Sequence, residues 1–381
     1  MPAEQIFTNA RVVTRDEVIL GTVAIRDGLI HDVSEGACSL SQAQDLQGDY
    51  LLPGLVELHT DNLEKFMNPR PGVDWPPESA VLAHDAQVVA AGITTVFDAL
   101  SIGDVNPKGD RLRQLPVMQN AISHAVQHRH TRADHLLHLR CELSHEKTLD
   151  VFNELVENPL VQMVSVMDHS PGQRQFVKLE KYREYYQGKY QMNDAEMEAF
   201  IERQMANSRR YSKEYRQRIA EECRQRSLSL ASHDDATAEH VRESADYGMC
   251  IAEFPTTVEA ASLSHQLGLK VLMGAPNIVR GGSHSGNVAA ADLAAQGVLD
   301  ILSSDYYPAS LLQAARRLAD ESPDYDLPRA VRSISLEPAL AAGLHDRGEI
   351  RAGLRADLVH VQSHAQQFVV QHVWRGGQRV F

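Results

Sequence analysis

The sequence predicts an α/β protein built on a (β/α)8 TIM-type barrel, with a small β domain formed by both chain termini. Short apolar runs alternate with helix-like segments over roughly 250 residues, which is the pattern of a closed barrel of eight parallel strands. No Gly-x-Gly-x-x-Gly turn follows the first of these runs, which disfavours the structural alternative, a doubly wound open sheet. The sequences at both ends of the chain are typical of β-strands.

The two ends of the chain are predicted to form one domain. Residues 6–13 and 21–25 read as strands, and Asp27-Gly28 is a hairpin turn signal. Strand-like sequence returns near the C-terminus, in residues 357–361 and 367–370. We therefore expect residues 1–52 and 346–381 to form a small β-sandwich domain and residues 53–345 to form the barrel.

Within the barrel, each predicted strand is a short apolar run. The eight runs are residues 55–58, 94–100, 135–143, 161–168, 227–233, 249–254, 270–275 and 299–305. The connection after the fourth strand is too long for an ordinary link. Residues about 178–226 are densely charged and rich in tyrosine, so we expect an inserted pair or trio of amphipathic helices there. This insertion is either a solvated helical face or a lid or oligomer contact.

The composition narrows the class of protein. At 381 residues and 43% hydrophobic content, the chain can bury a large core. The longest apolar runs are strand-sized, and the N-terminus lacks the basic and apolar segments of a secretory signal. Four scattered cysteines suit a reducing cytoplasm, and a net charge of -14 argues against binding to nucleic acid or anionic membranes. We expect a cytoplasmic protein with neither partner.

Metal-binding side chains follow the predicted barrel strands. The first strand ends in His59-Thr60-Asp61, where the two-residue period points the imidazole and the carboxylate to the same side. Later strands end in further residues of this kind: Glu142, His169, His233 and Asp305. The carboxyl ends of barrel strands carry the functional site. Each residue alone could be a helix cap or a satisfied polar group, but together they predict a metal site.

The predicted ligands divide between two ions. Three ligands are expected for the first ion: His59, Asp61 and Asp305. Two histidines are expected for the second, His169 and His233, with Glu142 as the bridge. A ligand set of imidazole and carboxylate groups suits zinc, and the large proportion of oxygen ligands also suits manganese. We therefore expect one or two divalent ions, zinc or manganese. Asp305 is the expected catalytic residue, which orients the attacking water and takes its proton.

Longer blocks of the sequence resemble a known superfamily. The lead-in at residues 53–59, the eight-unit middle and the segment 348–359 resemble the amidohydrolase superfamily over nearly the whole chain. The chain departs from the commonest pattern in two ways. Asp61 replaces the second histidine of a His-x-His motif, and no lysine suitable for carboxylation ends strand three or four. Glu142 is then the natural substitute as the bridge.

Four blocks narrow the resemblance to a subgroup. Residues 59–65, 69–76, 167–173 and 277–287 resemble the PhnM family of the carbon–phosphorus lyase pathway. Members of that family hydrolyse α-D-ribose 1-methylphosphonate 5-triphosphate to α-D-ribose 1-methylphosphonate 5-phosphate and pyrophosphate. The resemblance implies a metal-dependent diphosphatase of phosphonate catabolism, whose substrate is a phosphorylated ribose. Water activated at the metal site attacks the α-phosphorus in this interpretation.

A triphosphate needs cations and N–H donors around it. The loop after the seventh strand offers both, in Arg280, Gly281, Gly282, Ser283 and His284. Glycines let backbone N–H groups approach a phosphate closely. Lys65 and Arg70 after the first strand and Arg174 after the fourth are further candidates. The alternatives are an ordinary tight βα loop for the glycines and surface salt bridges for the cations.

Two other functions remain open from the sequence. One is a conventional amidohydrolase activity, which opens a cyclic amide or deaminates a base on the same barrel. The other is a metal-free barrel that serves as a non-enzymatic assembly component, although the joint presence of all the predicted ligands argues against it. We also expect a homo-oligomer, specifically a dimer.

Overall fold

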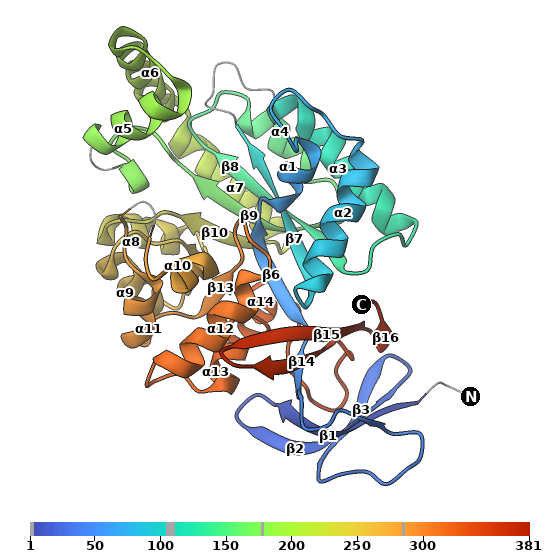
Figure 1. Ribbon diagram of the computed structural model, residues 1–381. Helices are drawn as coiled ribbons and strands as arrows, with labels where there is room; N and C mark the ends of the chain where they lie inside the picture. The colour runs from blue at the N-terminus through green and yellow to red at the C-terminus, as the bar shows by residue number, and fades with distance from the viewer. Residues whose placement is uncertain (1–3, 104–110, 177–178, 284–285) are drawn as a thin grey trace. The chain divides into compact units, whose positions relative to one another are not determined.

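The computed structural model describes residues 4–103, 111–176, 179–283 and 286–381, and the described strands form two sheets (Figure 1). One sheet runs in chain order through eight strands. They are β6 (Leu55–Thr60), β7 (Ile93–Ile102), β8 (Asp134–Glu142), β9 (Val161–Met167), β10 (Ser229–His233), β11 (Ile251–Glu253), β12 (Lys270–Gly274) and β13 (Ile301–Ser303). The first and last strands meet, because Thr60 and Asp305 form a parallel bridge. The predicted (β/α)8 barrel is confirmed.

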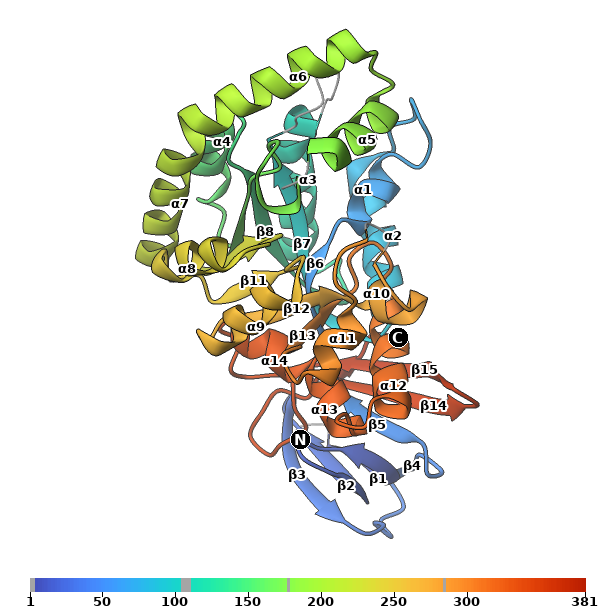
Figure 2. The same cartoon turned by 90° about the vertical axis from the view of Figure 1, so that its left-hand side faces the viewer.

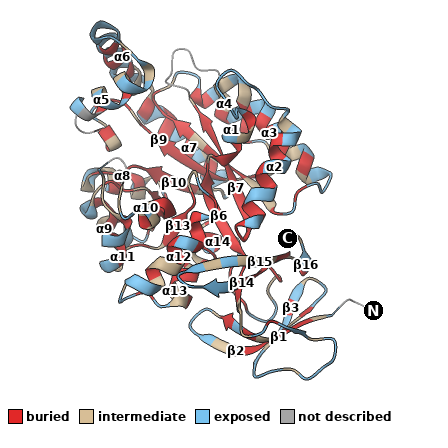
Figure 3. Ribbon diagram, viewed as in Figure 1, coloured by how far each residue is buried: buried red, intermediate tan, exposed pale blue. Residues whose placement is uncertain are grey.

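The barrel strands are apolar because both of their faces are covered. Every residue of β6 and β7 is buried, and Figure 3 shows the barrel strands almost uniformly in red. Parallel strands of α/β proteins read as continuous apolar runs for this reason. The ionisable side chains inside these two strands, Glu57, His59 and Asp98, are buried as well and therefore need polar partners.

The other sheet joins the two ends of the chain (Figure 1). Its strands are β1 (Gln5–Val13), β2 (Val18–Arg26), β3 (Leu29–Glu35), β4 (Gln44–Asp45), β5 (Tyr50–Pro53), β14 (Leu358–His364), β15 (Gln367–Arg375) and β16 (Gln378–Arg379). Phe7 and Trp374, from opposite ends of the chain, pack with ring centroids 4.6 Å apart. The sequence predicts a β-sandwich, but β5 pairs with β1 on one side and with β14 on the other, so the strands form one continuous sheet. The boundaries at residues 52 and 346 stay a prediction.

The chain divides into two compact units. The first unit comprises residues 1–98, 122–136 and 273–381. It contains the terminal sheet and the helices α1 (Asn62–Met67), α2 (Pro77–Ala90), α10 (Ala275–Arg280), α11 (Ala290–Ala295), α12 (Ser310–Glu321), α13 (Leu327–Arg332) and α14 (Leu336–Ala341). Helix α3 (Arg111–Gln127) contributes residues to both units.

The second unit comprises residues 99–121 and 137–272. Its helices are α4 (Thr148–Leu155), the 3-10 turn η1 (Arg174–Phe176), α5 (Leu179–Tyr190), α6 (Asp194–Asn207), the π-helical turn η2 (Ser208–Ser212), α7 (Lys213–Arg226), α8 (Ala238–Asp246) and α9 (Val258–Gln266). No helix in the described part of either unit combines the length and the hydropathy that a bilayer crossing requires.

The segment for which the sequence predicts an insertion is helical. Its start at residue 178 lies outside the described residues. The helix α5 comes first in the described part, and η2 then joins α6 to α7 in one bent helical run (Figure 2). A capping box begins α6: the Asn193 side chain accepts from the Glu196 N–H, and the Glu196 carboxylate accepts from the Asn193 N–H. Apolar side chains join α5 to α6, namely Phe176, Tyr182, Tyr186, Met197, Phe200 and Ile201. The role of the insertion stays a prediction.

One carboxylate in the first unit anchors the C-terminal segment to the start of β8. Asp134 pairs with Arg347 (2.8 Å), Arg355 (2.5 Å) and Arg375 (3.3 Å). Burial raises the pKa of Asp134, but the guanidinium groups, with Arg355 first, outweigh burial and hold that pKa below its ordinary value. The carboxylate therefore stabilises the fold in its ionised form.

We predict that Asp134→Asn lowers the free energy of unfolding by about 2 kcal/mol at pH 7, because it leaves the guanidinium groups around a neutral side chain. The folded-state pKa lies below the unfolded value, so the wild-type advantage is present above about pH 4 and is lost as the pH falls through the folded-state pKa. Urea denaturation at several pH values measures the difference.

The matched control for this prediction is Asp16→Asn, which removes an exposed carboxylate paired with Arg332 (3.0 Å). Exposed ion pairs contribute little to stability, so this variant should unfold like the wild type. Equal effects of the two substitutions would contradict the anchoring role of Asp134.

Candidate metal centre

The first predicted ligand group lies within the first unit. His59 is buried in β6, Asp61 follows that strand, and Asp305 follows β13. One ligand atom of each residue lies within 4.8 Å of those of the other two. Asp61 is the N-cap residue of α1, yet its side chain makes no capping hydrogen bond to the helix. The helix-cap alternative therefore does not account for Asp61.

Glu57 holds together the two segments that carry this group. Its carboxylate accepts hydrogen bonds from the backbone N–H of His59 (2.6 Å) and from that of Ser304 (2.5 Å). The Asp305 N–H in turn donates to the His59 carbonyl (3.1 Å). Burial raises the pKa of Glu57 to about 7. We call these contacts of the Glu57 carboxylate the Glu57 clamp.

The backbone of Asp305 is turned into the left-handed region, with φ +55°. Aspartate visits this region more readily than most residues, although the conformation still carries strain. The Thr60 hydroxyl donates to the Asp305 carbonyl (2.8 Å) and helps to hold this turn. A strained residue that is fixed by its surroundings is a reason to suspect a functional role, and the catalytic role of Asp305 stays a prediction.

A second group lies within the second unit, after β8, β9 and β10. His169 Nδ1 lies 2.6 Å from Glu142 Oε2. His169 Nε2 and His233 Nε2 lie 3.4 Å and 3.5 Å from the same oxygen, Oδ2 of Asp234. Two imidazole nitrogens and a carboxylate oxygen thus converge on one position, which is a donor set that suits a divalent ion. The bridging role of Glu142 stays a prediction.

The two histidines of this group differ in protonation. Burial lowers the pKa of His169, but Glu142 and Asp234 outweigh burial and raise that pKa to about 10. Burial also lowers the pKa of His233, and there it prevails over Asp234 and Glu253. Metal ions bind the neutral imidazole. His169 therefore has to release a proton when an ion binds.

Hydroxyl groups support the carboxylates of this second group. Ser144 donates to Glu142 Oε1 (2.7 Å). Ser208 in η2 donates to Asp168 Oδ2 (2.9 Å), on the residue before His169. π-Helical turns are frequent at functional sites. The helical segment after β9 therefore contacts residues that support the second group.

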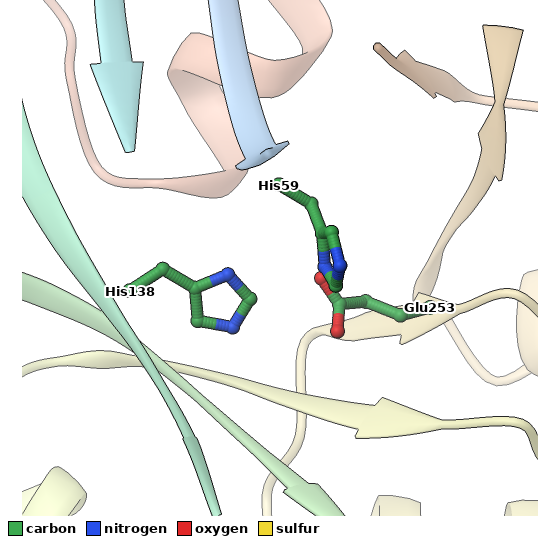
Figure 4. A group of neighbouring side chains, drawn as sticks. All are labelled: His59, His138 and Glu253. Atoms are coloured by element: carbon green, nitrogen blue, oxygen red, sulfur yellow. The ribbon is translucent and has the colours of Figure 1, made fainter. Parts of the chain in front are cut away.

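Two further buried side chains are drawn with His59 in Figure 4. Glu253 ends β11, and its Oε2 lies 3.2 Å from His233 Nδ1. His138 lies in β8, and a ligand atom of His138 lies within 4.8 Å of one of Glu253. Glu253 and Asp234 are not among the ligands that the sequence predicts. A charged residue that closes a short apolar run is the signal that could have identified Glu253.

Among the predicted phosphate contacts, Lys65 lies beside the segment that follows Asp305, and its phosphate role stays a prediction. Its Nζ donates to the carbonyl of Tyr306, the residue after Asp305, and lies 5.5 Å from the Tyr306 ring centroid. Arg70 and Arg280 are exposed in the same unit. These three cations and the first ligand group thus belong to one compact unit.

The glycine loop differs from its prediction. It does not follow the seventh strand directly but ends α10, where Gly281 with φ +79° is the C-cap. The N–H groups of Gly281 and Gly282 donate to carbonyls of α10, at 3.2 Å and 2.9 Å. Because these two N–H groups close the end of α10, the geometry does not favour a phosphate contact by either of them, and that role stays a prediction. Ser283 follows them, and the predicted His284 lies outside the described residues.

The surroundings of Arg174 do not favour the phosphate contact that the sequence predicts, which stays a prediction. Arg174 is 2% exposed and pairs with Asp235 and with Glu243 (3.1 Å). Burial lowers its pKa to about 10. Because its guanidinium faces carboxylates of the protein, Arg174 stabilises the second unit.

Comparison with known proteins shows the family of this chain. The model of the amidohydrolase family matches residues 77–381. The chain belongs to the amidohydrolase family. Within the curated members, the α-D-ribose 1-methylphosphonate 5-triphosphate diphosphatase of Escherichia coli (strain K12) is 55% identical over 377 residues, which cover 99% of this chain and 100% of that relative.

Solved structures of other family members share the fold. The N-acetyl-D-glucosamine-6-phosphate deacetylase of Mycobacterium smegmatis has a TM-score of 0.65 at 18% identity, over 99% of this chain and 100% of that one. The 5-methylcytosine deaminase of Klebsiella pneumoniae has a TM-score of 0.61 at 16% identity, over 99% and 98% of the two chains. At these identities the likeness concerns the fold alone.

Amidohydrolases are typically dependent on divalent metal ions. Both ligand groups of this chain combine imidazole nitrogen with carboxylate oxygen, and this donor set fits such ions. The chain is therefore a hydrolase with two groups of side chains suited to divalent cations.

We predict that His169→Ala lowers the affinity for divalent metal by at least about tenfold, since even loss of an outer-shell partner of a ligand costs about that much. Metal analysis of the purified, dialysed protein measures the change. His265→Ala, which removes an exposed histidine at the end of α9 in the same unit, is the control. Unchanged metal content in His169→Ala would count against its role as a ligand.

Proposed function

We propose that this chain hydrolyses α-D-ribose 1-methylphosphonate 5-triphosphate to α-D-ribose 1-methylphosphonate 5-phosphate and pyrophosphate, in phosphonate catabolism. The observation that carries the proposal is the 55% identity, over the full length, to the Escherichia coli diphosphatase. The first ligand group supports it, because Asp61 stands where conventional amidohydrolases have the second histidine of a His-x-His motif.

We propose zinc or manganese as the metal, with one or two ions. His59, Asp61 and Asp305 hold an ion in the first unit, and His169 and His233 hold one in the second, with Glu142 and Asp234 beside them. The ions supply Lewis acidity, which neutralises phosphate charge and makes water a better nucleophile. All other contributions come from side chains of the protein.

Asp305 accepts the proton of the water that attacks the α-phosphorus. A general base has to be held within hydrogen-bonding distance of that water. The Glu57 clamp holds the adjacent Ser304 N–H, and the Thr60 hydroxyl holds the Asp305 carbonyl. These contacts fix the backbone from which the Asp305 carboxylate projects, so its position does not depend on the substrate.

Cations of the first unit bind the phosphates. We propose Lys65, Arg70 and Arg280 for this role, with Ser283 and His284 as further candidates. Lys65 lies beside Tyr306, which follows the proposed base. Pyrophosphate leaves readily once its charge is neutralised, so the proposed mechanism needs no separate general acid.

We further propose a cytoplasmic homodimer that binds no nucleic acid. The net charge of -14 supports the last point, because nucleic-acid-binding surfaces are basic. All four cysteines are free thiols, which suits a reducing compartment. Light scattering of the purified protein tests the dimer.

We predict that the metal-replete protein releases pyrophosphate from the ribosyl triphosphate and that dialysis against a chelator abolishes this release. A coupled pyrophosphate assay with the synthetic substrate measures the rate. Re-addition of zinc or manganese is the control for irreversible loss of fold. Release of ammonia or opening of a cyclic amide, without pyrophosphate, would favour a conventional amidohydrolase instead.

We predict that Asp305→Asn reduces kcat by at least about a hundredfold, the usual contribution of a general base, while most of the bound metal is retained. Steady-state kinetics together with metal analysis checks both parts. Asp292→Asn, at an exposed position of α11 in the same unit, is the control. Turnover like that of the wild type in Asp305→Asn would remove Asp305 from the role of base.

A further inference from the structure

A chain of buried polar side chains runs through the first unit, outside the ligand groups. The Asn62 amide nitrogen lies 3.0 Å from His84 Nδ1, and His84 Nε2 lies 2.7 Å from Asp98 Oδ1. Asp98 Oδ2 lies 2.7 Å from His135 Nδ1, and His135 Nε2 lies 3.3 Å from Asp85 Oδ1. All five residues are buried. We call this set, Asn62, His84, Asp98, His135 and Asp85, the histidine–aspartate chain.

The hydrogen bonds of the histidine–aspartate chain have fixed directions. The Asn62 amide nitrogen can only donate, and it does so to Gln87 Oε1 (2.6 Å) as well as to His84. His84 Nδ1 is therefore an acceptor and carries no proton. The proton of His84 lies on Nε2 and is donated to Asp98. Rotation of either ring would break one of these bonds, so the chain defines a single arrangement.

The charges of the histidine–aspartate chain balance. Both nitrogens of His135 face carboxylates, so the ring is an imidazolium that donates twice. Burial lowers the pKa of His135, but Asp98 and Asp85 outweigh burial and raise that pKa to about 10. Asp85 also accepts from the Arg132 guanidinium (3.1 Å). Two carboxylates thus face one imidazolium and one guanidinium, and no charge is left buried without a partner.

These contacts distinguish the histidine–aspartate chain from a metal site. The ligand atoms of His84, Asp98 and His135 lie within 4.8 Å of one another, as in the ligand groups described above. However, Asp98 makes a 2.7 Å hydrogen bond to each ring through a different oxygen, whereas in the second ligand group one oxygen of Asp234 lies 3.4 Å and 3.5 Å from the two ring nitrogens. An ion could bind between His84 and His135 only by breaking these two short bonds, so the arrangement serves to hold side chains in place.

The end of the histidine–aspartate chain adjoins the first ligand group. Asn62 is the first residue of α1 and directly follows Asp61. Asp98 sits in β7 in register with Thr60, the residue before Asp61. The ligand-bearing turn is therefore held on both sides of Asp61. This anchorage fixes the backbone from which the Asp61 carboxylate projects.

We infer that the histidine–aspartate chain is a positioning device, which acts through Asn62 to orient Asp61 toward the ion of the first ligand group. The inference rests on the proposed function, because it assigns Asp61 the role of a ligand. Outer-shell partners of this kind commonly contribute about ten- to a hundredfold to metal affinity. Asn62 and His84 are then positioning residues, which touch neither the ion nor the substrate.

Two substitutions test the inference without leaving a charge unpaired. His84→Gln keeps an amide N–H that can donate to Asp98, but its carbonyl oxygen does not occupy the position of the ring Nδ1, which accepts from Asn62. Asn62→Ala removes the same link from the other side. We expect both variants to bind manganese about ten- to a hundredfold more weakly, with kcat lowered and KM little changed, because the phosphate contacts are intact. Chelator competition measures the affinity, and thermal unfolding of the metal-free protein reports on the fold.

The matched control is His360→Gln in the terminal sheet. His360 is also a buried histidine, and its Nε2 lies 3.0 Å from Asp49. Asp61→Asn marks the size of the effect when the ligand itself is changed. Wild-type manganese affinity in both His84→Gln and Asn62→Ala would overturn the inference, and so would an equal loss in His360→Gln. If the wild type released no pyrophosphate but the variants still lost manganese, the proposed function would fail and the positioning role would stand.

Discussion

The hydrogen bonds that Glu57 accepts hold together the two segments on which the first ligand group depends. One oxygen accepts from the strand that carries His59, and the other accepts from the segment that leads into Asp305. An apolar side chain at this position would leave two buried N–H groups without this acceptor, at a cost of about 1–3 kcal/mol each. Glu57 thus holds the first and last strands of the barrel together and also holds the segments that carry the predicted ligands.

Much of the fold could be predicted from the sequence because its determinants are local. Strands covered on both faces have to be apolar, so the eight runs are visible without knowledge of any tertiary contact. His59 and Asp61 were identified for a similar reason, since alternation along a strand fixes the side to which each side chain points. Asp305 was identified because it follows the last apolar run.

The parts that could not be predicted depend on backbone turns or on distant partners. Alternation places Asp234 on the side opposite to His233, but its φ of +58° turns the carboxylate back toward the same position. Gly281 was interpreted as part of a phosphate loop, because the sequence does not show where α10 ends. Arg174 looked available for a phosphate, because its partner Glu243 lies far along the chain.

Asp61 occupies a position where two roles of a carboxylate compete. Aspartate at a helix start ordinarily stabilises the helix by capping it, and such a cap contributes about 1 kcal/mol. Here the residue has the position of a cap without its hydrogen bond. Under the proposed function, the same carboxylate binds an ion, so the start of α1 forgoes the stabilisation that a cap would give, a trade-off between stability and activity.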